Sequence, residues 1–333
     1  MKILIVRLGA LGDIVHAVPA VAALRRALPD AAIDWVVEAR HREIVDLVRG
    51  LRRRVLIDTR RNWHRVAGVV GALRAERYDA AVDLQGLVKS AVLARLSGAR
   101  RVLGFDRPAL REPAAAVFYT ERHVRDDRQH VIEKNLALAA ALAPIDRALE
   151  FPLSIPPHHA PGDPYVLLNP GAAWPNKRWP ADRFGAVARW IRDRYELRSL
   201  VLWGPGERAL ADSVSAASAG AASAAPATSI ADVLALARDA RLVISGDTGP
   251  LHLAAAVSAP VIGLYGPTTA ARNGPWRPDD VTVSRYEGCA CHYERRCRRA
   301  SRCIDEIAVA DVQRAVEARL AAVPADRRTG EVR

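Results

Sequence analysis

The sequence predicts an α/β protein made of two doubly wound halves. Short apolar runs of strand length alternate with segments of helical periodicity along most of the chain, a pattern typical of parallel sheets covered by helices. The stretch 144–164 interrupts this alternation with several prolines and indicates a stiff connection. The 333 residues, 50% of them apolar, are enough for two cores. We expect domains over residues 1–155 and 163–333.

The first half begins with a strand, a glycine-containing loop and a helix. Residues 3–6 are an apolar run, residues 14–24 have helical spacing, and residues 33–37 form the next expected strand. The loop 7–13 contains Gly-x-x-Gly-Asp but lacks the third glycine of a dinucleotide-binding fingerprint, so a nicotinamide-dependent dehydrogenase is poorly supported. Asp13 lies at the carboxyl end of the first strand, where open α/β sheets bind ligands; its other possible role is to cap the helix that follows.

Later strands of the first half are followed by basic loops. We expect these strands at 55–57, 78–84 and 102–105, with helices ending at Leu96 and covering 131–142. Loops that follow parallel strands gather at one rim of the sheet, so several cationic loops there favour an anion site, although a solvated surface is the usual fate of charge runs. The basic residues concerned are Arg60, Arg61, Arg107, Arg111, His123, Arg125, Arg128 and His130.

The second half repeats the alternation. The expected strands are 165–168, 200–203, 241–244 and 260–266, and the expected helices are 184–194, 230–240, 308–323 and an alanine-rich one from 208. The C-terminal helix, 308–323, is free to pack back on the first half. Asp182 is placed to cap the helix that starts near residue 184. The Ala/Ser stretch 213–227 predicts a surface helix with a loop and carries no chemistry.

The loop 245–252, Ser-Gly-Asp-Thr-Gly-Pro-Leu-His, joins a strand to a helix in this half. The first amide groups of a helix lack partners within it and form a ready anion site. Thr248 can add a hydroxyl donor, and Gly249 lets a ligand approach the main chain closely. The alternative is that Asp247 or Thr248 only caps the helix. The loop 7–13, which is of the same kind, shifts the balance toward a ligand site.

The chain is strongly basic. Lys plus Arg number 49 against 37 for Asp plus Glu, a net charge of +12. This charge suits a polyanionic partner, or it only reflects a GC-rich genome, which favours arginine over lysine. A nucleic-acid-binding protein would need a basic stripe with aromatics or a helix-turn-helix, and neither is evident. No uncharged stretch has membrane-spanning length, and the N-terminus predicts a strand rather than a secretory signal, so we expect a cytoplasmic protein.

Five stretches, in this order, closely resemble the bacterial lipopolysaccharide heptosyltransferases, glycosyltransferase family 9. They are 9–19, 83–90, 177–180 (Lys-Arg-Trp-Pro), 203–205 (Trp-Gly-Pro) and 246–252. The likeness covers nearly the whole chain up to about Thr268. Arg111-Glu112-Pro113 and Gln129-His130 are more similar to heptosyltransferase I, which acts on a Kdo-lipid A acceptor, than to heptosyltransferase II.

The resemblance implies the GT-B fold, in which two Rossmann-like domains face one another across a cleft. The N-terminal domain would bind the acceptor and the C-terminal domain the nucleotide sugar. The implied reaction moves heptose from ADP-L-glycero-D-manno-heptose to the Kdo-lipid A inner core, with inversion at the anomeric carbon. Asp13 would be the general base that takes the proton of the acceptor hydroxyl.

The resemblance also assigns the other site residues. On the donor side, Lys177 would hold the departing diphosphate with Arg178 as helper, and Glu207 would accept hydrogen bonds from the ribose. Asp247 would orient the sugar hydroxyls. Thr248 and Gly249 would bind the phosphates, and His252 would support the loop that contains them. The acceptor-side residues would be Arg60, Arg61, Gln85, Lys89, Arg107, Arg111, His130 and Lys134.

This chemistry agrees with the residues. An inverting displacement needs one carboxylate on the acceptor side and charge stabilisation on the leaving-group side, with no nucleophilic side chain. The chain contains no Asp-x-Asp, so we expect no metal in the reaction, activity in the presence of EDTA, and no cofactor beside the ADP-heptose donor. The partner would be an anionic lipid-linked saccharide, with salt-sensitive peripheral attachment at the inner face of the inner membrane.

The four cysteines of the chain lie in one segment. They are Cys289, Cys291, Cys297 and Cys303, with His292 beside the first two. Their spacing is not the paired knuckle of common zinc sites, and a cytoplasmic location argues against stable disulfides. A metal or iron–sulfur site, redox-sensitive thiols and merely structural thiols all stay open.

Two other functions remain as alternatives. The first is a related family 9 transferase with another donor or acceptor, such as heptosyltransferase II or an autotransporter (protein) heptosyltransferase, and the basic loops from Arg60 to His130 would decide between them. The second is a non-enzymatic nucleotide- or nucleic-acid-binding protein. A nucleotide sensor would keep the Thr248 loop but would have no need for Asp13.

Overall fold

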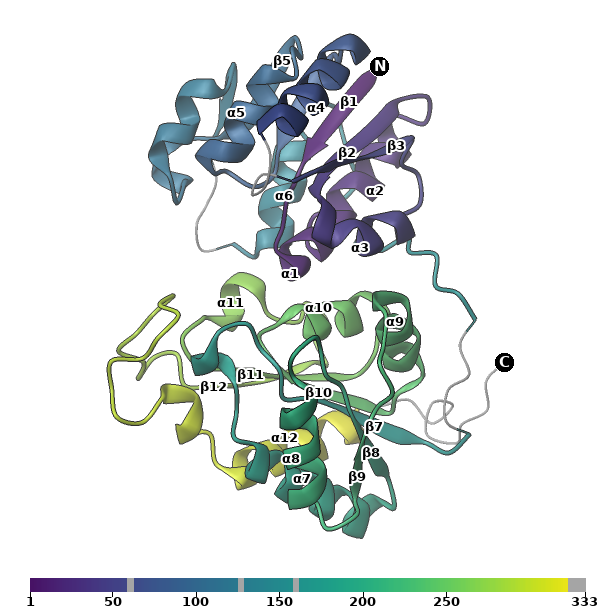
Figure 1. Ribbon diagram of the computed structural model, residues 1–333, viewed down its shortest axis with the longest axis vertical. Coiled ribbons are helices and arrows are strands. Elements are labelled where there is room, and N and C mark those ends of the chain that lie inside the picture. The colour runs from purple at the N-terminus through teal and green to yellow at the C-terminus, as the bar shows by residue number, and fades with distance from the viewer. Residues whose placement is uncertain (59–62, 125–128, 158–161, 323–333) are drawn as a thin grey trace. The chain divides into compact units, whose positions relative to one another are not determined.

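The computed structural model describes residues 1–58, 63–124, 129–157 and 162–322. The chain separates into two compact units, of which unit 1 is Met1–Ser154 and unit 2 begins at Ile155. Each unit contains its own six-stranded parallel sheet with helices packed on it (Figure 1). The two doubly wound sheets predicted from the alternation of strands and helices are therefore confirmed.

The sheet of unit 1 has the strand order β3-β2-β1-β4-β5-β6, and all of its pairs are parallel. Strand β1 is central, because Ile3 pairs with Ile33 on one side and with Ala80 on the other. Residues 3–6 are fully buried, which explains why this strand is a continuous apolar run. The strands are β1 (Lys2–Val6), β2 (Ala32–Glu38), β3 (Arg53–Ile57), β4 (Ala80–Asp83), β5 (Arg101–Phe105) and β6 (Glu121–His123).

The helices of unit 1 form two groups, since α2 packs against α6 and α4 against α5. The single helix expected over 14–24 is wrong: the helix is divided at His16 and Ala17 into two. Pro19 lies in the first turn of the second helix, and a proline ring there is incompatible with a continuous helix through the preceding turn. The helices are α1 (Leu11–Val15), α2 (Val18–Ala27), α3 (Arg42–Leu47), α4 (Trp63–Glu76), α5 (Val88–Leu96) and α6 (Val131–Ala139), with 3-10 turns η1 (Ala39–His41), η2 (Arg107–Ala109) and η3 (Pro113–Phe118).

Unit 2 repeats this topology. Its strand order is β12-β11-β10-β7-β8-β9. Read from the β9 edge, with β7 counted as the first strand, this is the same order as in unit 1. Strand β9 lies within the Ala/Ser stretch that we expected to be a helix and a loop, because Ala222 and Ala224 pair with β8. The strands are β7 (Tyr165–Asn169), β8 (Arg198–Val201), β9 (Ala222–Ala224), β10 (Leu242–Gly246), β11 (Val261–Tyr265) and β12 (Val281–Ser284).

Figure 1 shows α9 and α10 on one side of the unit 2 sheet and α7, α8 and α12 on the other. The last helix, α12, buries Val312 and Val316 in the core of unit 2 beside α7 and β12. The expectation that Asp182 caps α7 is wrong, because the N-cap residue is Pro180 and Asp182 lies in the first turn. The helices are α7 (Ala181–Tyr195), α8 (Arg208–Ala217), α9 (Ile230–Asp239), α10 (Gly249–Ala256), α11 (Ala270–Asn273) and α12 (Val309–Ala321), with η4 (Pro175–Lys177) and η5 (Cys303–Glu306).

The proline-rich connection belongs in part to unit 1. Arg26 on α2 lies 2.5 Å from carboxylate oxygens of both Asp146 and Glu150, and Leu153 forms a β-bridge with Val48. The first part of the expected connection, up to Ser154, therefore packs against unit 1.

The strand order also locates the places where ligands bind in such sheets. In each unit the order reverses between the first and fourth strands, which are β1 and β4 in unit 1 and β7 and β10 in unit 2. Doubly wound sheets bind ligands at the carboxyl ends of the strands on either side of this reversal. The loops 7–13 and 245–252 lie at these two positions.

Candidate functional site

In unit 1, Asp13 is held by two donors at the carboxyl edge of the sheet. Arg7, just after β1, has Nη2 2.8 Å from Asp13 Oδ1, and its Nη1 donates to the carbonyl of Leu84 after β4. Asp13 Oδ2 accepts from the N–H of Ala10 at 3.2 Å. Ala10 is the N-cap of α1, so Asp13 is not the N-cap, but this bond is the one that the third helical residue makes in a capping box. A carboxylate offers about four acceptor positions, so Asp13, which is partly exposed, can accept a further proton donor.

The neighbouring turn after β4 is organised by the buried carboxylate of Asp83. Its Oδ1 accepts from the N–H groups of Gln85 and Gly86, at 2.9 and 3.2 Å. Its Oδ2 accepts from the hydroxyls of Ser90 and Tyr119, at 2.8 and 2.7 Å. Burial raises the pKa of Asp83 although these four hydrogen bonds act to lower it. This network gives Asp83 and Ser90 a structural role in the stretch 83–90.

Gln85 and Lys89 lie at the same edge as Asp13. The Gln85 Oε1 atom accepts from the N–H of Leu8 at 2.7 Å, which ties the end of β4 to the end of β1. The Lys89 Nζ atom lies 3.0 Å from Glu38 Oε1 at the end of β2, and Arg40 lies 2.7 Å from the other oxygen of Glu38. The predicted residues after β1 and β4 thus lie at one edge of the sheet, beside Glu38 and Arg40 after β2, which were not predicted.

The remaining acceptor-side candidates differ in their surroundings. Arg107 and Arg111 are exposed in the segment after β5, where Glu112 accepts from the N–H of Val88 at 2.7 Å and joins this segment to α5. His130 is the N-cap of α6, and its ring packs edge-on against that of His16 at 5.5 Å. Lys134 is buried along α6. Arg60 and Arg61 lie outside the described residues.

In unit 2, the carboxylate of Asp247 is the centre of the loop after β10. Its Oδ2 lies 2.5 Å from Lys177 Nζ and 2.6 Å from the hydroxyl of Thr268. Its Oδ1 accepts from Asn273 Nδ2 at 2.6 Å and lies 3.3 Å from His252 Nε2. These four donors fill the acceptor positions of a carboxylate. The geometry therefore supports a role for Asp247 in holding Lys177; its orientation of sugar hydroxyls stays a prediction.

The charges around Asp247 keep it ionised. Burial on its own would raise the pKa of this carboxyl, but the hydrogen bond from His252 and the positive charge of Lys177 outweigh burial and hold the pKa well below its usual range. The loop thus contains a fixed negative charge whose cationic partner is Lys177.

Lys177 keeps one ammonium proton for a ligand. It donates to Asp247 through the carboxylate and, at 3.3 Å, through the backbone carbonyl, whereas an ammonium group has three donors. Its Nζ also lies 4.7 Å from the centre of the Trp174 ring. The backbone of Lys177 passes so close to Gly246 that an added Cβ there would lie 2.8 Å from the Lys177 carbonyl. Gly246 is therefore required for this approach.

Thr248 and Gly249 form the N-terminus of α10. Thr248 is the N-cap, but its side chain does not cap the helix; its Oγ1 accepts instead from Asn169 Nδ2 at 3.0 Å. Pro250 occupies the first turn, where its missing N–H is tolerated. The first-turn amides thus receive no side-chain cap, which leaves a site suited to an anion.

Glu207 and Arg178 form an ion pair beside the end of β7. Arg178 Nη2 lies 3.3 Å from Glu207 Oε1, and its Nε donates to the carbonyl of Ala172 at 2.7 Å. Glu207 Oε2 accepts from the N–H of Gly204 at 3.2 Å. A Cβ at position 171 would lie 2.1 Å from this oxygen, so only glycine at Gly171 leaves room for the Glu207 carboxylate.

Several residues of these sites were not identified from the sequence. They are Arg7, Asn169, Gly171, Thr268 and Asn273, which contact Asp13, Thr248, Glu207 or Asp247. Arg7 adjoins the glycine loop, and Asn169 and Gly171 follow a predicted strand, so their positions gave a signal. Thr268 and Asn273 lie 21 and 26 residues beyond Asp247, and no local pattern joins them to it.

The cysteines converge in unit 2. The Sγ atoms of Cys289, Cys291 and Cys303 all lie within 4.8 Å of one another, and Cys297 packs against these three. All four are free thiols. Burial raises the pKa of the Cys291 thiol to about 12, which makes it a poor nucleophile at neutral pH.

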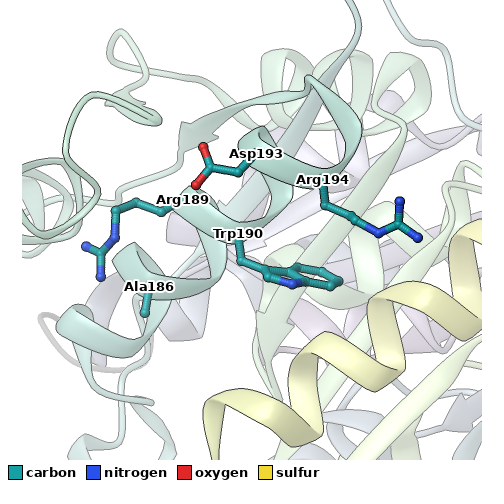
Figure 2. Close-up of a pocket in the computed structure, with 5 residues that line it drawn as sticks. All are labelled: Ala186, Arg189, Trp190, Asp193 and Arg194. Atoms are coloured by element: carbon teal, nitrogen blue, oxygen red, sulfur yellow. The ribbon is translucent and has the colours of Figure 1, made fainter.

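A surface depression on α7 lies away from these residues. Figure 2 shows its lining side chains, Ala186, Arg189, Trp190, Asp193 and Arg194, all of which come from this one helix. A helix that follows a parallel strand runs back toward the amino edge of the sheet, so this half of α7 is directed away from the ends of β7 and β10. The depression contains none of the predicted site residues, and we assign it no role.

Comparisons with known proteins agree with this arrangement. The family model described as "Glycosyltransferase family 9 (heptosyltransferase)" matches residues 66–301. Lipopolysaccharide heptosyltransferase 1 of Pseudomonas aeruginosa is 32% identical, over 89% of this chain and 87% of its own length. The structure of the Escherichia coli heptosyltransferase WaaC with ADP is similar, with a TM-score of 0.80 and 26% identity over 96% of this chain and all of that one.

A second structure of the same enzyme, with ADP-2-deoxy-2-fluoro heptose, has a TM-score of 0.75 and 27% identity, over 95% of this chain and 99% of that chain. The matched region contains β4, β5 and β6 of unit 1 and all six strands of unit 2, and it includes Lys177, the loop 245–252 and the turn after β4. The chain belongs to glycosyltransferase family 9, the heptosyltransferases.

Proposed function

We propose that this protein transfers heptose from ADP-L-glycero-D-manno-heptose to the Kdo-lipid A inner core of lipopolysaccharide, with inversion at the anomeric carbon. The observation that carries the proposal is the pairing of Lys177 with buried Asp247 beside the uncapped N-terminus of α10. This cation and these amides are suited to a sugar diphosphate. The ADP and ADP-2-deoxy-2-fluoro heptose of the similar structures support the same class of donor.

On the donor side, the remaining ammonium proton of Lys177 and the amides at Thr248 and Gly249 bind the diphosphate. As the bond between the anomeric carbon and the phosphate oxygen breaks, negative charge grows on the departing ADP, and these groups stabilise it. Glu207 accepts hydrogen bonds from the ribose, with Arg178 beside it. Asp247 and His252 hold the loop, and the sugar hydroxyls reach Asp247 only where they displace one of its protein donors.

On the acceptor side, Asp13 is the general base. The acceptor hydroxyl gives its proton to the Asp13 carboxylate while its oxygen forms the new bond to the anomeric carbon. Arg7 and the N–H of Ala10 fix the orientation of this carboxylate. Gln85, Lys89, Arg107, Arg111 and His130 contribute donors and positive charge for Kdo and lipid A phosphates, together with Arg60, Arg61 and Lys134.

We further propose that the reaction needs no divalent metal and that the protein attaches to the inner membrane surface peripherally. Lys177 and the α10 amides provide the positive charge that a metal would otherwise bring to the diphosphate. None of the described helices has the length and apolar character that crossing a bilayer requires. The net charge of +12 suits an anionic lipid-linked saccharide at a membrane surface, so binding to anionic vesicles should weaken as salt is raised.

The decisive experiment is incubation with ADP-heptose and either Kdo2-lipid A or a soluble core acceptor, followed by mass spectrometry. A mass increase of one heptose unit on the acceptor, with release of ADP, is the expected result. Addition only to an acceptor that already contains heptose, or only to a protein, would instead identify the family 9 alternatives. Adding Mg2+ or a brief EDTA treatment should leave the rate unchanged.

A further inference from the structure

Four cysteines gather in the segment between β12 and α12. Residues 285–302, all described by the structure, form neither helix nor strand, and loops longer than about 12–15 residues without regular structure are uncommon in compact domains. The buried hydrophobic cluster under this segment consists only of Cys289, Cys291 and Cys303, with Cys297 packed against it. A loop with no aliphatic or aromatic core of its own needs another kind of attachment.

We propose that Cys289, Cys291, Cys297 and Cys303 form a structural site for one tetrahedral transition-metal ion of the thiolate-preferring class, Zn2+ or iron. Three of the sulfurs already lie within 4.8 Å of one another, with Cys289 Sγ 3.5 Å from Cys291 Sγ and 2.9 Å from Cys303 Sγ. A metal–sulfur distance of about 2.3 Å in a tetrahedron separates the sulfurs by roughly 3.8 Å. These three sulfurs therefore need only small side-chain shifts to bind one ion.

The fourth ligand and the charge balance also fit. Cys297, the most exposed of the four, lies at the side of this group, and the N–H of Cys291 donates to Cys289 Sγ at 3.4 Å, as second-shell donors to a metal thiolate do. Binding releases four thiol protons to solvent and leaves a site of charge −2 with a divalent ion. The segment 289–303 contains five arginines and one glutamate, which offset that charge.

His292 is not required as a ligand. Its Nε2 lies 2.8 Å from the carbonyl of Tyr286, and its ring is stacked on the ring of the same tyrosine at 4.1 Å. The sulfurs alone thus make up the coordinating group, which favours Zn2+ or iron over harder ions such as Mg2+.

The cysteine-containing loop contacts two of the segments that touch Asp247. Asn176 Nδ2, beside Lys177, donates to the carbonyl of Glu294 at 2.7 Å and lies 3.9 Å from Cys291 Sγ. The N–H of Tyr293 donates to the carbonyl of Pro267 at 2.9 Å, next to Thr268. The ion would thus fix the turn that carries Lys177 and the hydroxyl that binds the same carboxylate. This part of the inference rests on the proposed donor site.

The test begins with the metal content of the full chain, purified without chelator or metal-affinity steps and measured by plasma mass spectrometry. The expected result is about one zinc or iron ion per chain, lost in Cys303→Ser and Cys289→Ser and retained in His292→Ala as the matched control. Less than about a tenth of an ion per chain in the wild type, or a disulfide among these cysteines, overturns the site. The wild-type content decides this even where a serine variant fails to fold.

A second measurement tests the link to Lys177. Releasing the ion from the wild type with a mercurial reagent, followed by removal of the reagent with thiol, should weaken ADP binding by about fivefold or more in calorimetry, and adding back the ion should restore it. If the ADP affinity is the same before and after the ion is removed, the link to Lys177 is overturned, but the metal site itself is not. A wild type that contains the ion but does not bind ADP overturns the proposed donor site instead.

Discussion

The ammonium group of Lys177 lies 2.5 Å from the carboxylate of Asp247, and the two residues approach from segments 70 positions apart in the chain. Both side chains are nearly buried, with 15% and 3% of their surfaces exposed. A buried pair of this kind is poor evidence of stability, because the loss of solvation offsets the attraction of the charges. Its value is positional, since it fixes one cation beside the N-terminus of α10.

Replacing Asp247 with Asn should destabilise unit 2 in a pH-dependent way. Removing one partner of a buried ion pair costs about 3–5 kcal/mol. The folded-state pKa of Asp247 lies below its ordinary value of 3.8, so its contribution is fully present above that ordinary value and is lost as pH falls toward the lower, folded-state pKa. The difference in Tm between wild type and Asp247→Asn, measured by calorimetry, should be largest near pH 7 and should shrink below about pH 4. A difference that grows on acidification would contradict the pairing.

Replacing Asp13 with Ala or Asn should abolish turnover. A positioned general base contributes on the order of 100- to 10,000-fold, so kcat should fall by about that factor, while ADP affinity in calorimetry stays near the wild-type value because Asp13 is not a donor-side group. The matched control is Asp30→Ala, an exposed acid between α2 and β2. Ordinary turnover by the Asp13 variants would remove the assigned role.

Replacing Gly171 with Ala should have the same effect on donor binding as removing the Glu207 side chain. The added Cβ would lie 2.1 Å from Glu207 Oε2, so the carboxylate must move away from the N–H of Gly204. We expect Gly171→Ala and Glu207→Ala each to raise the KM for the donor by about tenfold, the loss of roughly one charge-assisted hydrogen bond. The double variant should be no worse than either single one. Gly162→Ala, where an added Cβ meets nothing within 4 Å, is the control.

Replacing Asp83 should separate hydrogen bonding from charge. In Asp83→Ala the N–H groups of Gln85 and Gly86 lose their acceptor, so Tm should fall by an amount that corresponds to about 2–5 kcal/mol. Asp83→Asn keeps one carbonyl oxygen for these two groups, and the hydroxyls of Ser90 and Tyr119 can rotate to accept from the amide. It should therefore lose less than about 2 kcal/mol. Equal destabilisation by both variants would show that charge matters more than satisfied donors.

The sequence predicted those parts of the fold that depend on local pattern. Residues 3–6 of β1 and 242–244 of β10 are unbroken apolar runs, and the loops 7–13 and 245–252 that follow them each contain glycine and an acid. The prediction from sequence was wrong where a local pattern indicated another structure or where no local pattern was present. The spacing of residues 14–24 is helical throughout, yet Pro19 divides the helix, and Ala222–Ala224 becomes a strand only because β8 offers an edge to pair with.

The same limit applies to the site. Asp13 and Thr248 were predicted because each lies in a loop that follows a strand, and Lys177 was assigned from the resemblance of the stretch 177–180 to the heptosyltransferases. Thr268 and Asn273 were not, because their contact with Asp247 arises only when β11 is paired beside β10. The resemblance to known heptosyltransferases indicated the chemical roles of these residues. The residues that contact them and fix their positions could be identified only from the structure.

The fastening of residues 146–154 onto unit 1 has a practical consequence. Arg26, with Asp146 and Glu150, and the bridge between Val48 and Leu153 draw the border between the units at Ser154 and Ile155. A gene fusion made at this junction would exchange entire lobes between members of the family without cutting a core. Under the proposed division of the two substrate sites, hybrids of this kind inherit acceptor preference from one parent and sugar-nucleotide preference from the other.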